Sequence, residues 1–82
     1  MATKILVVDD EPDLREILQC NLENAGYAVD TAESAEQALE LLTPQHALIL
    51  LDVMMAGMSG FAMAEKLRKE LHNPVPIIFL TA

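Results

Sequence analysis

Apolar and polar positions along this chain alternate between short apolar runs and stretches of helical periodicity. Four runs are typical of strands buried on both faces, because they are short and rich in aliphatic and β-branched residues. They cover residues 4–10, 27–32, 46–52 and 75–82. The stretches between them repeat apolar residues at helical spacing, which predicts three helices. The pattern therefore indicates the order β-α-β-α-β-α-β.

Capping residues and helix breakers mark the ends of these helices. Pro12 stands in the first turn of the first helix, where Asp10 or Glu11 can cap it. The other boundary signals are Gly26 as a stop, the capping box of Ser34 and Gln37, Pro44, Ser59 as a cap, and Pro74 after the third helix. On that third helix we expect Phe61, Ala64, Leu67 and Leu71 to form the inner face.

Strands that alternate with helices through short connections predict parallel pairing and right-handed crossovers, with helices on both faces of the sheet. The fold class is therefore α/β, a doubly wound parallel sheet. With 82 residues the chain is long enough for one small domain, residues 1–82, around a single thin core.

Composition narrows the possible partners. The net charge of −8 argues against direct binding to nucleic acid or to an anionic membrane, because both would repel this segment. No apolar run approaches the length of a membrane span. The single cysteine, Cys20, excludes an intrachain disulfide, and no export signal is recognisable, so we expect a cytoplasmic location.

Acidic residues follow two of the strand candidates. Asp9 and Asp10 end the first strand, Asp52 ends the third, and Thr81 ends the fourth. Ligands of parallel sheets bind beyond the carboxyl ends of the strands, and these side chains converge there if the three strands are neighbours. Alone, "DDEPD" is more often an acidic helix start than a metal site, and an Asp after a strand is often a turn former. Thr is a common strand residue, so Thr81 alone indicates nothing. Together, oxygen ligands without His or Cys suit a hard cation such as Mg²⁺.

Three motifs, "ILVVDDEP", "LILLDVMMAGMSGF" and "PIIFLTA", resemble in order and spacing the receiver domain of two-component response regulators. The resemblance covers the whole chain and implies a flavodoxin-like sheet with strand order 2-1-3-4-5. It also implies that the domain takes a phosphoryl group from a sensor histidine kinase or a phosphotransfer protein. The expected output is transcription, through a DNA-binding domain beyond this chain.

The resemblance assigns a role to each matching residue. It implies that Asp52 is the phosphoacceptor, that Thr81 contacts the phosphoryl group as a switch, and that the backbone N–H of Ala82 helps to hold it. The implied Mg²⁺ ligands are Asp10 directly, Asp9 largely through water, Asp52, and the backbone carbonyl of Met54. Such a domain is not a conventional enzyme, although it promotes its own phosphorylation and can dephosphorylate itself.

The chain departs from the family pattern in its loop and at its end. Ala56 stands where proline is common, which should loosen the loop slightly without removing a chemical group. Ser59 stands where Asp is frequent, and both residues can cap a helix. The last helix, strand and helix of the family fold are missing after the fourth strand, together with a lysine that clamps the phosphoryl group. We therefore expect impaired phosphorylation of this 82-residue segment, and self-association through the open edge of "PIIFL".

Three other functions compete with that of a receiver. A phosphate-independent interaction module with the receiver fold is favoured by the missing lysine. A phosphatase or phosphotransferase of the haloacid-dehalogenase group places a second acid two residues after its nucleophile. This chain has Met54 at that position, which disfavours such an enzyme. A dinucleotide-binding domain is disfavoured because "DDEPDL" lacks the glycines that such a loop needs.

Overall fold

The computed structural model describes residues 2–80 and confirms the predicted order of elements. The elements are β1 (Lys4–Val8), α1 (Pro12–Asn24), β2 (Ala28–Ala32), α2 (Ala35–Leu41), β3 (His46–Asp52), α3 (Gly60–Lys69) and β4 (Ile77–Leu80). All strand pairs are parallel, and the sheet order β2-β1-β3-β4 confirms the predicted topology. No helix among the described residues is long and apolar enough to cross a membrane.

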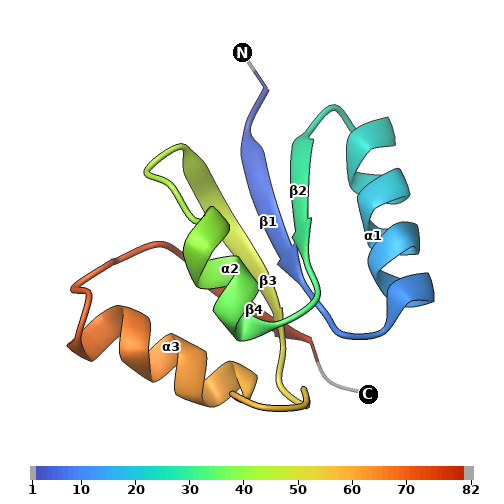
Figure 1. Cartoon of the computed structure of the whole chain (residues 1–82). Coiled ribbons are helices and arrows are strands. Elements are labelled where there is room, and N and C mark those ends of the chain that lie inside the picture. The colour runs from blue at the N-terminus through green and yellow to red at the C-terminus, as the bar shows by residue number, and fades with distance from the viewer. Residues whose placement is uncertain (1, 81–82) are drawn as a thin grey trace.

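The helices cover the two faces of the sheet unequally (Figure 1). The main core lies between the sheet and the helices α2 and α3, and its largest fully buried members are Leu6, Ile49, Leu51, Met63 and Leu67. Helix α1 lies on the other side and buries no residue fully, although Ile5 and Val7 of β1 are buried. Alternate residues of β1 therefore face opposite layers, as a doubly wound sheet requires.

The predicted inner face of α3 is wrong in two of its four residues. Phe61 and Leu71 are more than half exposed, whereas Met63 and Leu67 are fully buried. Met63 and Leu67 are one helical turn apart and share the face toward the sheet, and Phe61, two positions before Met63, lies on another side. There its ring packs against Phe79 of β4, with 4.9 Å between ring centroids. Leu71 lies beyond the end of the helix.

Two of the predicted helix caps are confirmed. The Ser34 hydroxyl accepts the backbone N–H of Gln37 at 3.0 Å, and the Ser59 hydroxyl accepts that of Ala62 at 3.1 Å. The Gln37 side chain reaches back to the N–H of Glu33 at 2.7 Å. Both caps fix the first turn of a helix next to the carboxyl end of the sheet.

The start of α1 differs from its prediction. Glu11 occupies the capping position, but its side chain makes no capping hydrogen bond. Instead, Oδ1 of Asp9 accepts the backbone N–H of Glu11 at 2.8 Å. The carboxylate that ends β1 therefore also fixes the turn into α1.

At the opposite end of the sheet, β1 and β3 pair with a bulge. Lys4 pairs with His46, but Ile5 pairs with Leu48, so that Ala47 has no partner on β1. The extra residue shifts the register of all later pairs by one position.

His46 is held at this bulge by a network of polar contacts. Its side chain is fully buried, and Nδ1 accepts the backbone N–H of Thr43 at 3.0 Å. This contact leaves the proton on Nε2, which donates to Oδ2 of Asp30 at 2.8 Å. The ammonium group of Lys4 lies 3.3 Å from the same oxygen. The network connects β1, β2 and β3 at one end of the sheet.

Replacing Asp30 with Asn tests this network. The hydrogen bond from His46, followed by Lys4, holds the pKa of Asp30 below its usual value of 3.8. Because the folded-state pKa is the lower one, the carboxylate stabilises the fold above pH 3.8, and this contribution is lost as the pH falls through the folded-state value. We expect Asp30→Asn to lower the free energy of urea unfolding by about 1 kcal/mol near neutral pH. If Asp30→Asn lowered the free energy of unfolding by the same amount below the folded-state pKa as at neutral pH, the contribution of Asp30 would not be ionic.

Candidate functional site

The register of β1 against β3 brings two aspartates side by side. Val8 pairs with Leu51, so the next residues, Asp9 and Asp52, follow at adjacent positions. Val8 and Leu51 both belong to the core beneath α2 and α3. Because side chains alternate along a strand, Asp9 and Asp52 both belong to the opposite face, at the carboxyl edge of the sheet. The predicted convergence of these strand ends is confirmed for the two aspartates.

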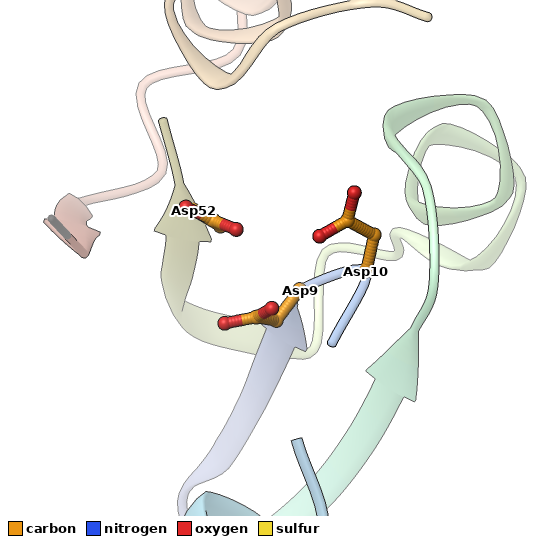
Figure 2. Close-up of side chains that lie close together, drawn as sticks. All are labelled: Asp9, Asp10 and Asp52. Atoms are coloured by element: carbon orange, nitrogen blue, oxygen red, sulfur yellow. The ribbon is translucent and has the colours of Figure 1, made fainter. Parts of the chain in front are cut away.

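Asp10 completes a cluster of three carboxylates (Figure 2). One oxygen from each of Asp9, Asp10 and Asp52 lies within 4.8 Å of the others, and the side chains point toward a common space. Asp9 is buried, Asp52 is half-buried and Asp10 is exposed. The cluster is therefore open to solvent on one side and enclosed by the sheet on the other.

Backbone N–H groups orient each of the three carboxylates. Besides the bond from Glu11 to Asp9, Oδ1 of Asp52 accepts the N–H of Met54 at 3.1 Å. Oδ2 of Asp10 accepts the N–H of Ala56 at 3.2 Å. Oδ2 of Asp9 is buried and has no hydrogen-bond partner among the described residues. A buried acceptor without a partner is costly, so this oxygen points to a ligand.

Burial raises the pKa of Asp9 above its usual value, and the charges of Asp52 and Asp10 act in the same direction. The hydrogen bond from Glu11 opposes the rise but does not cancel it. A cation would offset both causes, because its charge would compensate the repulsion and its coordination would replace the hydration that the buried carboxylate has lost. Three oxygen donors, with neither His nor Cys among them, fit a hard divalent cation such as Mg²⁺.

The other predicted site residues are placed only in part. Met54 lies two residues after Asp52, the last residue of β3, and is 79% exposed. Its backbone therefore lies beside the cluster, as its predicted role requires. Thr81 and Ala82 lie outside the described residues, and their roles stay predictions.

The backbone after Asp52 leaves no room for a side chain at Gly60. The N–H of Gly60 donates to the carbonyl of Val53 at 3.0 Å, which brings the start of α3 against the end of β3. A Cβ atom at Gly60 would overlap the carbonyl oxygen of Asp52. The absence of a side chain lets α3 begin directly beside the acidic cluster.

The ion pairs of Lys4, Lys66 and Lys69 lie away from this cluster. Lys4 pairs with Asp30 at the other end of the sheet, Lys69 pairs with Glu65 of α3, and Lys66 pairs with Glu70, which caps that helix. Sequence reasoning missed Arg15, whose Nη1 donates to the backbone carbonyl of Asp9 at 2.7 Å. Arg15 thus contacts the backbone of the cluster rather than its carboxylates.

Comparisons with known proteins agree with this geometry. Residues 5–82 match the family model described as the response regulator receiver domain. The chain is 48% identical over 80 residues to a probable transcriptional regulator, ycf27, of Cyanophora paradoxa, covering 96% of this chain and 33% of the relative. It is 43% identical over 82 residues to the uncharacterized transcriptional regulatory protein YrkP of Bacillus subtilis, covering all of this chain and 35% of the relative. The chain thus spans about a third of these relatives.

A solved structure is similar over the whole chain. It is the response regulator protein TrrA of Thermotoga maritima, crystallised in complex with Mg²⁺ and BeF. The TM-score is 0.88 at 44% sequence identity, and the match covers 100% of this chain and 70% of TrrA. The match shows that the arrangement of this sheet and its helices is that of response regulators.

Replacing Asp9 with Asn tests the repulsion in the cluster. Because the folded-state pKa of Asp9 is raised, its ionisation costs stability, and the stability of the metal-free protein falls as the pH rises through that pKa. Asn keeps an oxygen for the Glu11 N–H and removes the charge. We expect Asp9→Asn to raise the free energy of urea unfolding at neutral pH by about 1 kcal/mol without metal.

The matched control is Asp13→Asn, which removes an acidic group from the first turn of α1, outside the cluster. This control should not gain stability. A loss of stability in Asp9→Asn, or an equal gain in the control, would contradict the proposed repulsion. At a Mg²⁺ concentration of about 100 times Kd the wild type should gain about 2.7 kcal/mol, and Asp9→Asn should gain less.

Proposed function

The chain belongs to the family of response regulator receiver domains, and we propose that it accepts a phosphoryl group on Asp52. The donor would be a phosphohistidine of a sensor histidine kinase or phosphotransfer protein, since receiver domains work with such partners. The observation that carries the proposal is the cluster of Asp9, Asp10 and Asp52 within 4.8 Å, with a buried Asp9 oxygen that has no hydrogen-bond partner within residues 2–80.

The proposed transfer exchanges one bond to phosphorus for another. A carboxylate oxygen of Asp52 attacks the phosphorus atom and forms an acyl phosphate, while the P–N bond breaks and its electron pair leaves with the imidazole. The chain contributes mainly positioning, which phosphoryl transfer needs more than further covalent chemistry. The N–H of Met54 fixes the rotation of the Asp52 side chain, and Glu11 fixes that of Asp9.

We further propose that Asp9, Asp10, Asp52 and the backbone carbonyl of Met54 hold Mg²⁺. When bound, the ion would offset the repulsion between the carboxylates and the incoming phosphoryl oxygens. The similar TrrA protein was crystallised in complex with Mg²⁺, which supports this choice of metal.

For the whole protein we propose control of transcription. The relatives ycf27 and YrkP are named as transcriptional regulators and are about three times as long as the matched segment. With a net charge of −8, this segment would not itself bind nucleic acid. Contact with DNA would therefore fall to another part of a longer protein.

Incubation with Mg²⁺ and acetyl phosphate tests the phosphoacceptor. We expect the intact mass to rise by one phosphoryl group in the wild type, because Asp52 is half-buried rather than fully buried and belongs to the carboxylate cluster that we propose holds the cation. Asp52→Asn should give no adduct. The measurement is intact mass spectrometry, repeated after mild base, which hydrolyses an acyl phosphate.

Asp13→Asn is the matched control, because it makes the same change at an exposed aspartate of α1 outside the cluster and should keep the adduct. An adduct that survives in Asp52→Asn would refute the assignment of the acceptor. No adduct in the wild type would favour the phosphate-independent interaction module. That alternative is supported by the lysines, each of which pairs with an acidic residue away from the cluster.

We also propose that the 82-residue polypeptide self-associates through β4. Among the described residues β4 pairs only with β3, so its outer edge keeps unpaired backbone groups. Ile78 is 52% exposed and Phe79 39% exposed on this strand, and Phe61 packs against Phe79. An apolar edge strand of this kind is a template for pairing with a second chain.

Replacing Ile78 with Lys tests this association. A charge on an edge strand opposes pairing with another copy, so we expect the variant to sediment as a monomer at concentrations where the wild type forms dimers. The control is Ile17→Lys, an equally exposed isoleucine on α1, which should associate like the wild type. A wild type that stays monomeric over the whole concentration range of sedimentation velocity would contradict the proposal.

A further inference from the structure

The loop that follows Asp52 is held not only by Asp10 of the acidic cluster but also by Glu36, a carboxylate outside that cluster. Oε1 of Glu36, in the first turn of α2, accepts the backbone N–H of Met58 at 3.3 Å. The two oxygens of Glu36 also lie near Gly57, at 3.5 and 3.7 Å from the position of a Cβ atom there. Two neighbouring residues of the loop therefore face the same side chain.

The position of Glu36 is itself well defined. Helix α2 begins with the Ser34 cap, and Ala35 and Ala38 on its inner face are fully buried against the sheet. Glu36 lies between these two anchors, and its exposed side chain extends toward the loop between β3 and α3. Its hydrogen bond to Met58 connects residues 22 positions apart in the sequence.

Besides the Met54 N–H, which Asp52 accepts, the loop of residues 53–59 has two attachments to carboxylates that are distant in the sequence. At Ala56 the N–H donates to Asp10, and at Met58 the N–H donates to Glu36. The first acceptor belongs to the carboxylate cluster and would share its oxygens with a cation. The second lies outside that cluster, so its hydrogen bond does not compete with the cation.

We propose that Glu36 is a positioning residue for the acidic site: it keeps the loop seated while Asp10 coordinates the cation. The loop begins with the backbone of Met54, whose N–H orients Asp52 and whose carbonyl is a proposed ligand. A loop that is held at Met58 presents this backbone in one arrangement, which lowers the entropic cost of binding the ion. The inference rests on the proposed function, because it assigns Glu36 a role in binding Mg²⁺.

Two substitutions separate the hydrogen bond from the charge. Glu36→Gln keeps an oxygen that can accept the Met58 N–H and removes the charge, whereas Glu36→Ala removes both. We expect Glu36→Ala to raise the Kd for Mg²⁺ about 2- to 10-fold, the range that corresponds to the loss of one hydrogen bond. Glu36→Gln should stay close to the wild type.

The measurement is a titration of the 82-residue protein with MgCl₂, followed by the amide resonances of residues 53–59. Hydrogen exchange of the Met58 amide, measured without metal, reports the hydrogen bond directly and should be faster in Glu36→Ala only. The control is Glu40→Ala, which removes a glutamate from the same helix and is expected to leave both quantities unchanged.

The outcomes distinguish this inference from the function on which it rests. A wild type without saturable shifts would overturn the proposed Mg²⁺ site and, with it, the role of Glu36. A wild type that binds Mg²⁺ while Glu36→Ala binds equally well would overturn the role of Glu36 alone. Equal weakening in Glu36→Gln and Glu36→Ala would show that charge rather than the hydrogen bond matters, and would also overturn the positioning role.

Discussion

The register of β1 against β3 is the constraint on which the candidate site depends. Without the bulge at Ala47, the pairing that starts at Lys4 and His46 would place Val8 beside Leu50 and Asp9 beside Leu51. Paired residues share a face of the sheet, and Leu51 belongs to the core beneath α2 and α3. In that register Asp9 would therefore pair with a core residue instead of lying beside Asp52. The single extra residue therefore decides that Asp9 and Asp52 share a face at the same height of the sheet.

The bulge lies at the opposite end of the sheet from the aspartates. His46, which opens β3, is buried there with both ring nitrogens in hydrogen bonds, one of them to Asp30 of β2. Burial of an imidazole is tolerated when its polar atoms are paired, and these contacts fix the first residue of β3 relative to its neighbours. A polar network at one end of the sheet thus holds the register that forms the acidic cluster at the other.

The sequence predicted what local signals encode. Short aliphatic runs located the strands, Ser34 and Ser59 located two helix starts, and the strand-end aspartates indicated the cluster. The inner face of α3 was mispredicted because Phe61 is more apolar than its neighbours, although its ring packs on Phe79 at the surface. The contact of Glu36 with Met58 has no local signal, since it depends on how a helix and a distant loop meet in three dimensions.

Asp9 links the stability of this small domain to its proposed chemistry. One of its oxygens fixes the turn into α1 by accepting the Glu11 N–H. The other is buried beside two further carboxylates and has no hydrogen-bond partner in the part of the chain that the structure describes. An apolar or larger side chain at this position would no longer accept the Glu11 N–H in the turn. A side chain whose polar atoms were all hydrogen-bonded would have no atom free to bind a cation. An unpaired buried acceptor costs about 1–3 kcal/mol, a considerable part of the roughly 5–15 kcal/mol typical of a domain. A cation that coordinates this oxygen would recover that free energy, so that binding at the rim and folding of the sheet are coupled through one side chain.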